Sequence, residues 1–255
     1  MNNKQSNSSV TKSNHEFALY LHDFSNIQSQ PYAITITDEN LVHRLKNVLR
    51  LKIDDHCLLF DQKSHARFRV HRFEGKNKVV GLLYESKQNT ILHPEITFIL
   101  PLLKMDALSD AVYSLAEVGI TKIQLVTTQK TQTPYSAHLI EKLERVAIAA
   151  AEQSKMFAYP QILPAIKLSD WLSKAQADLQ ESENYYFDVS GVDVTLWYQK
   201  PQIDKKYQLL VGPEGDLTQE EKELVRSAGF QFCALTPTIL RSIRAISLIS
   251  GLFRL

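Results

Sequence analysis

Two short loops, each directly after an apolar run, hold the residues of this sequence whose types and spacing could do chemistry. The first, residues 212–216, reads Gly-Pro-Glu-Gly-Asp and follows the apolar run 207–211. The second, residues 236–242, reads Thr-Pro-Thr-Ile-Leu-Arg-Ser and follows the apolar run 232–235. A buried strand that ends in Gly-Pro-x-Gly presents bare backbone, because glycine has no side chain. Two strand-end loops of this kind could bind one flat ligand through main-chain amides and carbonyls.

The first loop does not match the common phosphate-binding motifs. No Gly-Lys-Ser/Thr follows it, as a Walker loop requires, and it is not a Gly-x-Gly-x-x-Gly segment. A lone Gly-Pro-Glu-Gly is also typical of an ordinary tight turn, and taken alone it favours that interpretation.

The elements that must position these loops follow from the apolar pattern. From residue 95 onward the sequence alternates between apolar strand-like runs and amphipathic helical segments. Strands are expected at 96–100, 123–126, 185–188, 207–211 and 232–235, and helices at 106–118, 136–153 and 169–179, with a further helix after each of the last two strands. This alternation predicts an α/β fold with a mostly parallel sheet covered on both faces.

Residues 15–88 predict a smaller, β-rich unit. Residues 66–73 alternate between apolar and basic side chains, a turn is expected at 74–77, and 79–84 is a hairpin partner. Before these strands, one apolar face of a short helix is formed by Leu41, Val42, Leu45, Val48 and Leu49. The polar segment 87–94, which ends in proline, marks the boundary to a second domain at 92–255.

Composition sets further limits. Lys and Arg total 29 against 28 for Asp and Glu, so a nucleic-acid partner would have to use a local basic patch. No apolar run approaches the roughly 18–20 residues of a membrane span. Residues 1–14 are polar and predict a disordered tail rather than a signal peptide. Cys57 and Cys233 lie inside apolar runs without metal-ligand spacing, which favours buried thiols, no metal and a cytoplasmic protein.

Five segments, in order, resemble the SPOUT-class methyltransferases, and more narrowly the RsmE type, which methylates N3 of a uridine in 16S ribosomal RNA. The first loop, with Leu217, Thr218 and Glu221 after it, is similar to that family's GPEGG loop. The others are His43 with 48–51 (H…VLRL), 117–120 (EVGI), 147–154 with Pro160 (AIAAAEQS…P) and 235–241 (L…ILR). The resemblance spans almost the whole chain after the tail.

This resemblance implies a SPOUT α/β domain with a C-terminal trefoil knot, plus an N-terminal PUA-like β-barrel that binds RNA. It implies S-adenosyl-L-methionine as cofactor, bent between the two loops, and 16S rRNA or the small ribosomal subunit as substrate. The expected cofactor-binding residues are Leu210, Gly212, Pro213, Glu214, Gly215, Leu235, Thr236, Ile239 and Leu240.

A homodimer with its active site near the subunit interface is also implied. The last helix fits this, because apolar residues surround it on most sides and it must be buried. These residues are Ile239, Leu240, Ile243, Ile246, Leu248, Ile249, Leu252 and Phe253.

Arg241 is the expected catalytic residue. Uracil N3 must lose a proton, and a nearby cation would stabilise the charge that develops on the ring. Arg241 could instead grip the target phosphate or be a surface arginine, although the start of a helix is unfavourable for a cation. RNA contacts are expected at His43, Arg44, Lys46, Arg50, Arg67 and Arg69, together with His71. The alternative is an ordinary solvated face.

The sequence departs from the family pattern inside these motifs. Asp216 stands where the GPEGG loop has glycine, and it could obstruct the approach of the cofactor. Residues of the LGxRILRxETA segment are replaced at Thr236, Thr238, Ile243 and Arg244. Two alternatives therefore stay open: a diverged relative that binds rRNA without methylating it, and a methyltransferase that acts on another RNA position.

Overall fold

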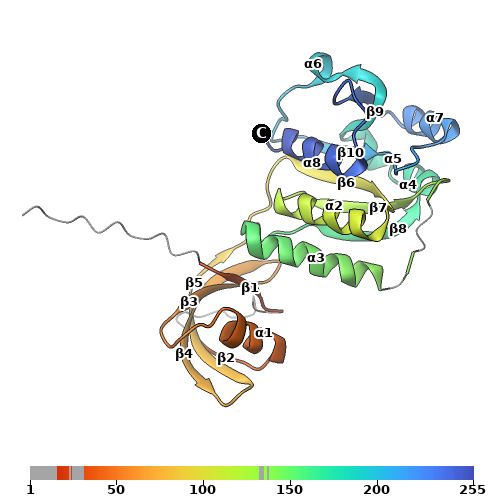
Figure 1. Cartoon of the computed structure of the whole chain (residues 1–255). Coiled ribbons are helices and arrows are strands. Elements are labelled where there is room, and N and C mark those ends of the chain that lie inside the picture. The colour runs from red at the N-terminus through yellow and green to blue at the C-terminus, as the bar shows by residue number, and fades with distance from the viewer. Residues whose placement is uncertain (1–15, 23, 25–31, 132–134, 137) are drawn as a thin grey trace, which may run out of the picture.

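The structure is a computed structural model, and it describes residues 16–22, 24, 32–131, 135–136 and 138–255. Two β-sheets succeed one another along the chain, the smaller one first (Figure 1). The expected tail at residues 1–14 lies outside the described residues.

The smaller sheet has five strands in the order β1-β3-β4-β5-β2. Their bounds are Ala18–Tyr20 (β1), Tyr32–Ile36 (β2), His56–Phe60 (β3), Ser64–Glu74 (β4) and Lys78–Gln88 (β5). The long strands β4 and β5 pair antiparallel, which confirms the predicted hairpin and its turn after Glu74. Strand β1 pairs parallel with β3, and the other pairs are antiparallel.

A short helical segment packs on one face of this sheet. Helix α1 (Glu39–His43) continues into the π-helical turn η2 (Arg44–Val48), and the Asp38 carboxylate caps it by accepting a 2.7 Å hydrogen bond from the Leu41 amide. Leu41, Val42 and Leu45 are buried against the sheet, as predicted. Val48 is 60% exposed, because the wider π turn rotates it off the apolar face.

The larger sheet has six strands, all parallel, in the order β11-β9-β10-β6-β7-β8. Their bounds are Glu95–Pro101 (β6), Lys122–Thr127 (β7), Gln161–Lys167 (β8), Glu183–Asp193 (β9), Lys206–Val211 (β10) and Gln231–Ala234 (β11). The predicted parallel sheet is confirmed. Strand β8 was not anticipated, because it contains Pro164; an edge strand tolerates proline, and β8 is an edge.

Helices cover both faces of this sheet (Figure 1). They are α2 (Met105–Glu117), α3 (Leu139–Ser154), α4 (Leu168–Lys174), α5 (Gln176–Gln180), α6 (Val194–Trp197), α7 (Gln219–Ser227) and α8 (Ser242–Leu252). The helix expected at 169–179 is two helices, because the chain breaks at Ala175, and the helix expected at 136–153 begins at Leu139.

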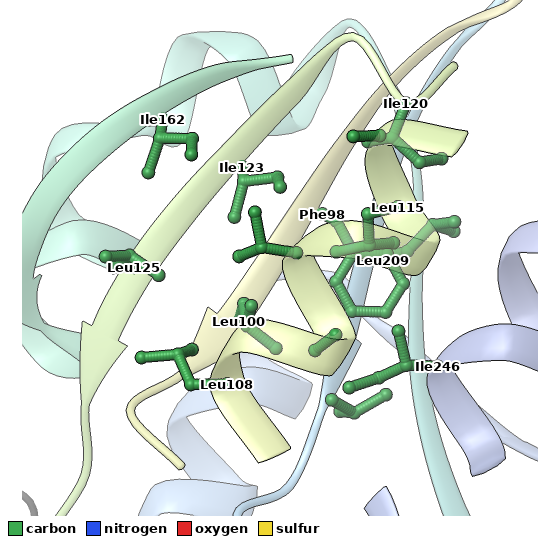
Figure 2. Close-up of a cluster of buried hydrophobic side chains, with 14 of the residues drawn as sticks. Phe98, Leu100, Leu108, Leu115, Ile120, Ile123, Leu125, Ile162, Leu209 and Ile246 are labelled. Carbon is green, nitrogen blue, oxygen red and sulfur yellow. The ribbon is translucent and has the colours of Figure 1, made fainter. Parts of the chain in front are cut away.

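Alternation along the buried strands distributes their side chains to the two faces. Phe98 and Leu209 enter the core that contains α2, α3 and α8, and Figure 2 shows them beside Leu115 and Ile246. Their neighbours on the same strands, Ile99 and Leu210, enter the opposite core, beneath α4 and α7. A continuous apolar run is therefore required wherever a strand is buried on both sides.

Helix α8 buries one face rather than most of its circumference. Ile246 and Ile249 are fully buried, whereas Leu248 is 40% exposed, and Ile239 and Leu240 precede the helix. The eight apolar residues are therefore divided between a core face and a surface.

Hydrogen bonds to one buried carboxylate hold the unit of the small sheet against the unit of the large sheet. Glu152, near the end of α3, is only 7% exposed, and it accepts hydrogen bonds from both terminal nitrogens of Arg44, at 2.9 and 2.5 Å. It also accepts one from the Tyr20 amide at 3.1 Å. Beside it, Phe60 stacks on Phe157 with ring centroids 4.5 Å apart. This bidentate pair at a buried carboxylate holds the small sheet on α3.

In the described part of the chain, no helix is long and apolar enough to cross a membrane. The same residues contain no cluster of three or more His, Cys, Asp or Glu side chains arranged to hold a metal ion.

Candidate active site

A cavity of about 620 Å³ lies between the middle of β9 and the end of β10, a size typical of small-molecule sites. Its walls come from the middle of β9, the loop after β10, the segment that leads into α8 and the first turn of that helix. The lining residues are Ala107, Phe187, Asp188, Val189, Val211, Gly212, Pro213, Glu214, Asp216, Ile239, Leu240, Arg241, Ser242, Ile243 and Ala245.

The wall from β9 is an irregular stretch of that strand. Phe232 of β11 pairs with Tyr186, but the next residue, Cys233, pairs with Val192, so residues 187–191 of β9 bulge out of the pairing. Phe187, Asp188 and Val189 belong to this bulge, and all three line the cavity. The bulge thus turns side chains toward the cavity that a regular strand would place elsewhere.

The loop after β10 offers its backbone to the cavity. A hydrogen bond of 2.9 Å from the Asp216 amide to the Pro213 carbonyl closes it into a turn. A Cβ atom at Gly212 would lie only 2.9 Å from an Asp216 carboxylate oxygen, so any side chain there would displace that carboxylate. On the outer side, the Lys130 ammonium donates to the Gly215 carbonyl at 2.7 Å.

The carboxylate of Asp216 makes polar contacts away from the backbone of this loop. One oxygen accepts from the Tyr186 hydroxyl at 2.9 Å and from the Leu217 amide at 2.8 Å. The other pairs with Lys222 of α7 at 2.7 Å, and Lys222 also pairs with Asp188 at 2.7 Å. These partners hold the carboxylate in place, and Asp216 also lines the cavity, so its predicted obstruction of the cofactor stays a prediction.

These contacts shift the pKa values of three side chains at the site. Burial, and then the neighbouring Asp216 carboxylate, raise the pKa of the Tyr186 hydroxyl far above its usual range. Burial disfavours the charge on Lys222, but hydrogen bonds to Asp188 and Asp216 outweigh it and raise the pKa of the ammonium. Burial likewise opposes charge on Asp188, yet hydrogen bonds from Lys222 and Ser190 lower the pKa of its carboxyl. At neutral pH, Tyr186 therefore stays protonated and uncharged, Lys222 stays positively charged and Asp188 stays negatively charged.

The segment before α8 closes the cavity. The Thr236 hydroxyl donates to the Thr238 carbonyl at 2.8 Å, so this side chain is used within its own loop. Arg241 is the N-cap residue of α8, and its side chain is exposed at the cavity wall. Among the described residues Arg241 has no ion-pair partner, which leaves its charge available to a ligand.

The predicted cofactor residues fall into three groups. Gly212, Pro213, Glu214, Ile239 and Leu240 line the cavity together with Arg241. Leu235 and Thr236 line a smaller pocket of about 80 Å³ that shares Ile239 and Leu240 with it. Leu210 points into the core on the other face of the sheet, and Gly215 lines a separate polar pocket beyond the loop.

Sequence reasoning missed two charged residues of the site. Asp188 lines the cavity from β9, and Lys222 lies behind it on α7. The signal for Asp188 was present, because it is the first charged residue after the apolar run 185–187. Lys222 gave no such signal, since a lysine on an amphipathic helix is ordinarily solvated.

The Thr218…Glu221 motif has a structural role beside the loop. Thr218 and Glu221 form a reciprocal capping box at the start of α7. The buried Glu221 carboxylate also accepts a 2.8 Å hydrogen bond from the Gln129 amide, after β7. One carboxylate therefore fixes α7, and with it Lys222, against the neighbouring strand-end loop.

The six residues predicted to contact RNA do not form one patch. Arg67 and Arg69 alternate with the buried Ala66, Phe68 and Val70, so they lie on the face of the small sheet opposite α1. Arg67 is also ion-paired with Glu16 and Glu85, at 3.2 and 3.3 Å.

The remaining four lie on or after the short helix. His43, Lys46 and Arg50 are exposed, and Arg50 follows η2 with a positive φ of 53°. Arg44 is engaged with Glu152, as described above. Its contact with RNA stays a prediction, as do those of the other five.

Comparison with known proteins bears on this site. A family model described as an RNA methyltransferase domain matches residues 91–253. The protein named Ribosomal RNA small subunit methyltransferase E from Rickettsia conorii is 28% identical over 194 residues, 76% of this chain and 78% of that protein. A protein of the same name from Synechocystis is 24% identical over 212 residues, 83% of this chain and 69% of that protein.

The fold also matches a solved structure. The crystal structure of a Ribosomal RNA small subunit methyltransferase E from Neisseria gonorrhoeae, bound to S-adenosyl methionine, superposes with a TM-score of 0.80 at 24% identity. The alignment covers 93% of this chain and 96% of that one. This likeness shows the α/β fold. Since the family model spans well over half of the sequence, the chain belongs to the RNA methyltransferase domain family, and its predicted resemblance to the RsmE type is confirmed.

Proposed function

We propose that this chain transfers the methyl group of S-adenosylmethionine to N3 of a uridine in small-subunit ribosomal RNA. The observation that carries the proposal is the cavity between the middle of β9 and the end of β10, which has loop backbone on one side and the exposed Arg241 on the other. The names of the relatives support the substrate class, and the cofactor bound in the Neisseria structure supports the donor.

The cavity fits the cofactor in size and in chemistry. The backbone of residues 212–214 would bind polar edges of the ligand, and Ile239 and Leu240 would pack against its apolar and aromatic parts. S-adenosylmethionine, when bound, supplies a methyl group already activated on a sulfonium. Phe187, which is buried, would exclude water from part of the same space.

The chain's own residues then have modest tasks. They must align N3 of the uracil with the methyl group, which can contribute about 7–11 kcal/mol to catalysis. The N3 proton would pass to solvent water and leave an anionic ring. N3 would then bond to the methyl carbon as the S–C bond breaks, which neutralises both the ring anion and the sulfonium. Arg241, free at the cavity wall, would stabilise that charge while the nucleophile forms.

We extend the proposal to the topology implied by the family, a knotted C-terminal region and a PUA-like barrel at residues 15–88. The knot is proposed from the resemblance to the family. In the region concerned, the neighbouring strands β9 and β11 approach closely, since a Cβ atom added to Gly191 would lie 2.4 Å from the Cys233 amide nitrogen. The barrel is supported by the five strands of the small sheet, which curve around α1 (Figure 1). We assign three of the exposed cations of this unit to RNA phosphates: Lys46 and Arg50, on or just after the short helix, and Arg69, on the opposite face of the sheet.

The proposal includes a homodimer formed through α8. Its support is the apolar surface beside the cavity, where Ile239 is 85% exposed and Leu248 is 40% exposed. Exposed apolar side chains of this size at the mouth of a site favour an interface. Sedimentation or light scattering of the purified protein would decide the oligomeric state.

Two measurements test the function. Isothermal calorimetry with S-adenosylmethionine should show one site per chain, and folded protein without binding would favour the diverged, non-methylating alternative. Mass analysis of small-subunit rRNA from a deletion strain should then show one missing methyl on uridine N3. A methyl lost from a different base would refute the assigned position while keeping the enzyme class.

A further inference from the structure

Behind the cavity, a chain of ion pairs connects three segments that are distant in sequence. The Lys222 ammonium lies 2.7 Å from Asp216 in the loop after β10 and 2.7 Å from Asp188 in the β9 bulge. Lys222 belongs to α7, whose start is fixed by the Thr218–Glu221 capping box. The lysine therefore ties two walls of the cavity to one helix.

Asp216 occupies a backbone conformation that disfavours it. Its φ is 60°, in the left-handed region that glycine adopts readily and aspartate tolerates at a cost. Three contacts to its carboxylate compensate: those from the Tyr186 hydroxyl, the Leu217 amide and the Lys222 ammonium. The side chain therefore selects this conformation over the many that the loop backbone could otherwise adopt.

The same carboxylate lies directly against the loop that would bind the cofactor. Its nearer oxygen is 2.9 Å from the position of a Cβ atom on Gly212, and the Tyr186 hydroxyl is 3.4 Å from that position. Both groups thus lie against Gly212, and Asp216 also lines the cavity, so its carboxylate contacts the loop beside the space for the ligand.

We propose that Asp216 is a positioning residue, which together with Lys222 and Tyr186 holds loop 212–215 in its cofactor-binding conformation. The inference rests on the proposed function for its ligand. Asp216, which stands where the family has glycine, then has a favourable effect: its side-chain hydrogen bonds order a loop that would be more flexible with glycine at this position. Asp216 then acts through the loop and does not touch the reacting atoms.

Three substitutions separate the contributions. Asp216→Gly removes the carboxylate and relieves the φ, Asp216→Ala removes the carboxylate and keeps the φ unfavourable, and Tyr186→Phe removes one hydroxyl while its ring stays packed on Phe232. The matched control is Glu223→Ala, which removes an exposed carboxylate from the same helix, α7. Among the described cationic side chains, this carboxylate forms an ion pair only with Arg226.

Calorimetry with S-adenosylmethionine gives the first readout. Loss of a charge-assisted contact predicts about 10- to 100-fold weaker binding by Asp216→Gly, weaker still for Asp216→Ala, and a loss of a few fold for Tyr186→Phe. In turnover, the KM for the cofactor should rise while kcat stays within about threefold, and the control should match the wild type.

Hydrogen exchange of the ligand-free proteins gives the second readout, which does not depend on any ligand. Amides of residues 212–217 should exchange faster in Asp216→Gly than in the wild type and the control. Unchanged affinity and unchanged exchange in Asp216→Gly would overturn the proposal, and so would a fall in kcat with an unchanged KM. A wild type that fails to bind S-adenosylmethionine would defeat the proposed function, and the exchange comparison would still decide the role of Asp216.

Discussion

Replacement of Gly191 by alanine is a sharp test of the packing between β9 and β11. The added Cβ atom would lie 2.4 Å from the Cys233 amide nitrogen and 2.5 Å from the Phe232 carbonyl carbon, both main-chain atoms. Relief of these contacts requires one backbone segment to move by about 1 Å, because neither is a flexible side chain. Overpacking of this kind costs roughly 3 kcal/mol, the upper part of its usual range.

For a chain of this size, that loss corresponds to a fall in Tm of about 6–12 °C. The position also closes the β9 bulge, whose residues Phe187, Asp188 and Val189 line the cavity. We therefore expect weaker binding of S-adenosylmethionine by the variant as well, because the cavity wall must shift with the strand.

Scanning calorimetry of the purified variants measures the effect. The matched control is Gly251→Ala in α8, where an added Cβ atom would meet nothing within 4 Å. Alanine favours a helix over glycine by about 0.5–1 kcal/mol, so the control should keep its Tm or gain a few degrees. If the Gly191→Ala protein melts within about 2 °C of the wild type, the packing between β9 and β11 is looser than described, and the reasoning is refuted.

Three further predictions follow from individual contacts. Arg241→Ala should leave the calorimetric affinity for S-adenosylmethionine within about threefold and lower kcat by about 100-fold, since it removes a charge that acts on the reacting ring; an unchanged rate would return Arg241 to a surface role. Arg44→Ala should lower the free energy of unfolding by about 1–3 kcal/mol in urea titration, because it leaves the Glu152 carboxylate without its pair, whereas Arg44→Ala with Glu152→Gln should recover part of this loss. Burial raises the pKa of both the Cys57 and the Cys233 thiols to about 12, so neither should react with a thiol reagent at pH 8 until denaturant exposes both, and fast labelling of the native protein would contradict the described burial.

The sequence determined the fold class and most strands of the larger sheet, although not the edge strand β8. The apolar runs at 96–100 and 207–211 have to be strands covered on two faces, because every residue of each run is apolar or nearly so, and the structure buries their alternate side chains in opposite cores. The hairpin of the small sheet followed from period-two alternation, which depends only on local geometry. The loop at 212–216 was identified because glycine at a strand end leaves the backbone open.

Only the tertiary structure decided which charges act together. Arg44 and Glu152 are 108 residues apart, and nothing in either local pattern distinguishes them from solvated helix residues. The same holds for Lys222, which reaches Asp188 only because β9, β10 and α7 converge at one edge of the sheet. The six residues predicted to bind RNA are all basic, but they do not lie on one face of the small unit. Strand alternation places Arg67 and Arg69 on the face of the sheet opposite α1. Local sequence fixes backbone conformation through short-range sterics, whereas pairing across the fold depends on packing between distant elements, which no local pattern encodes.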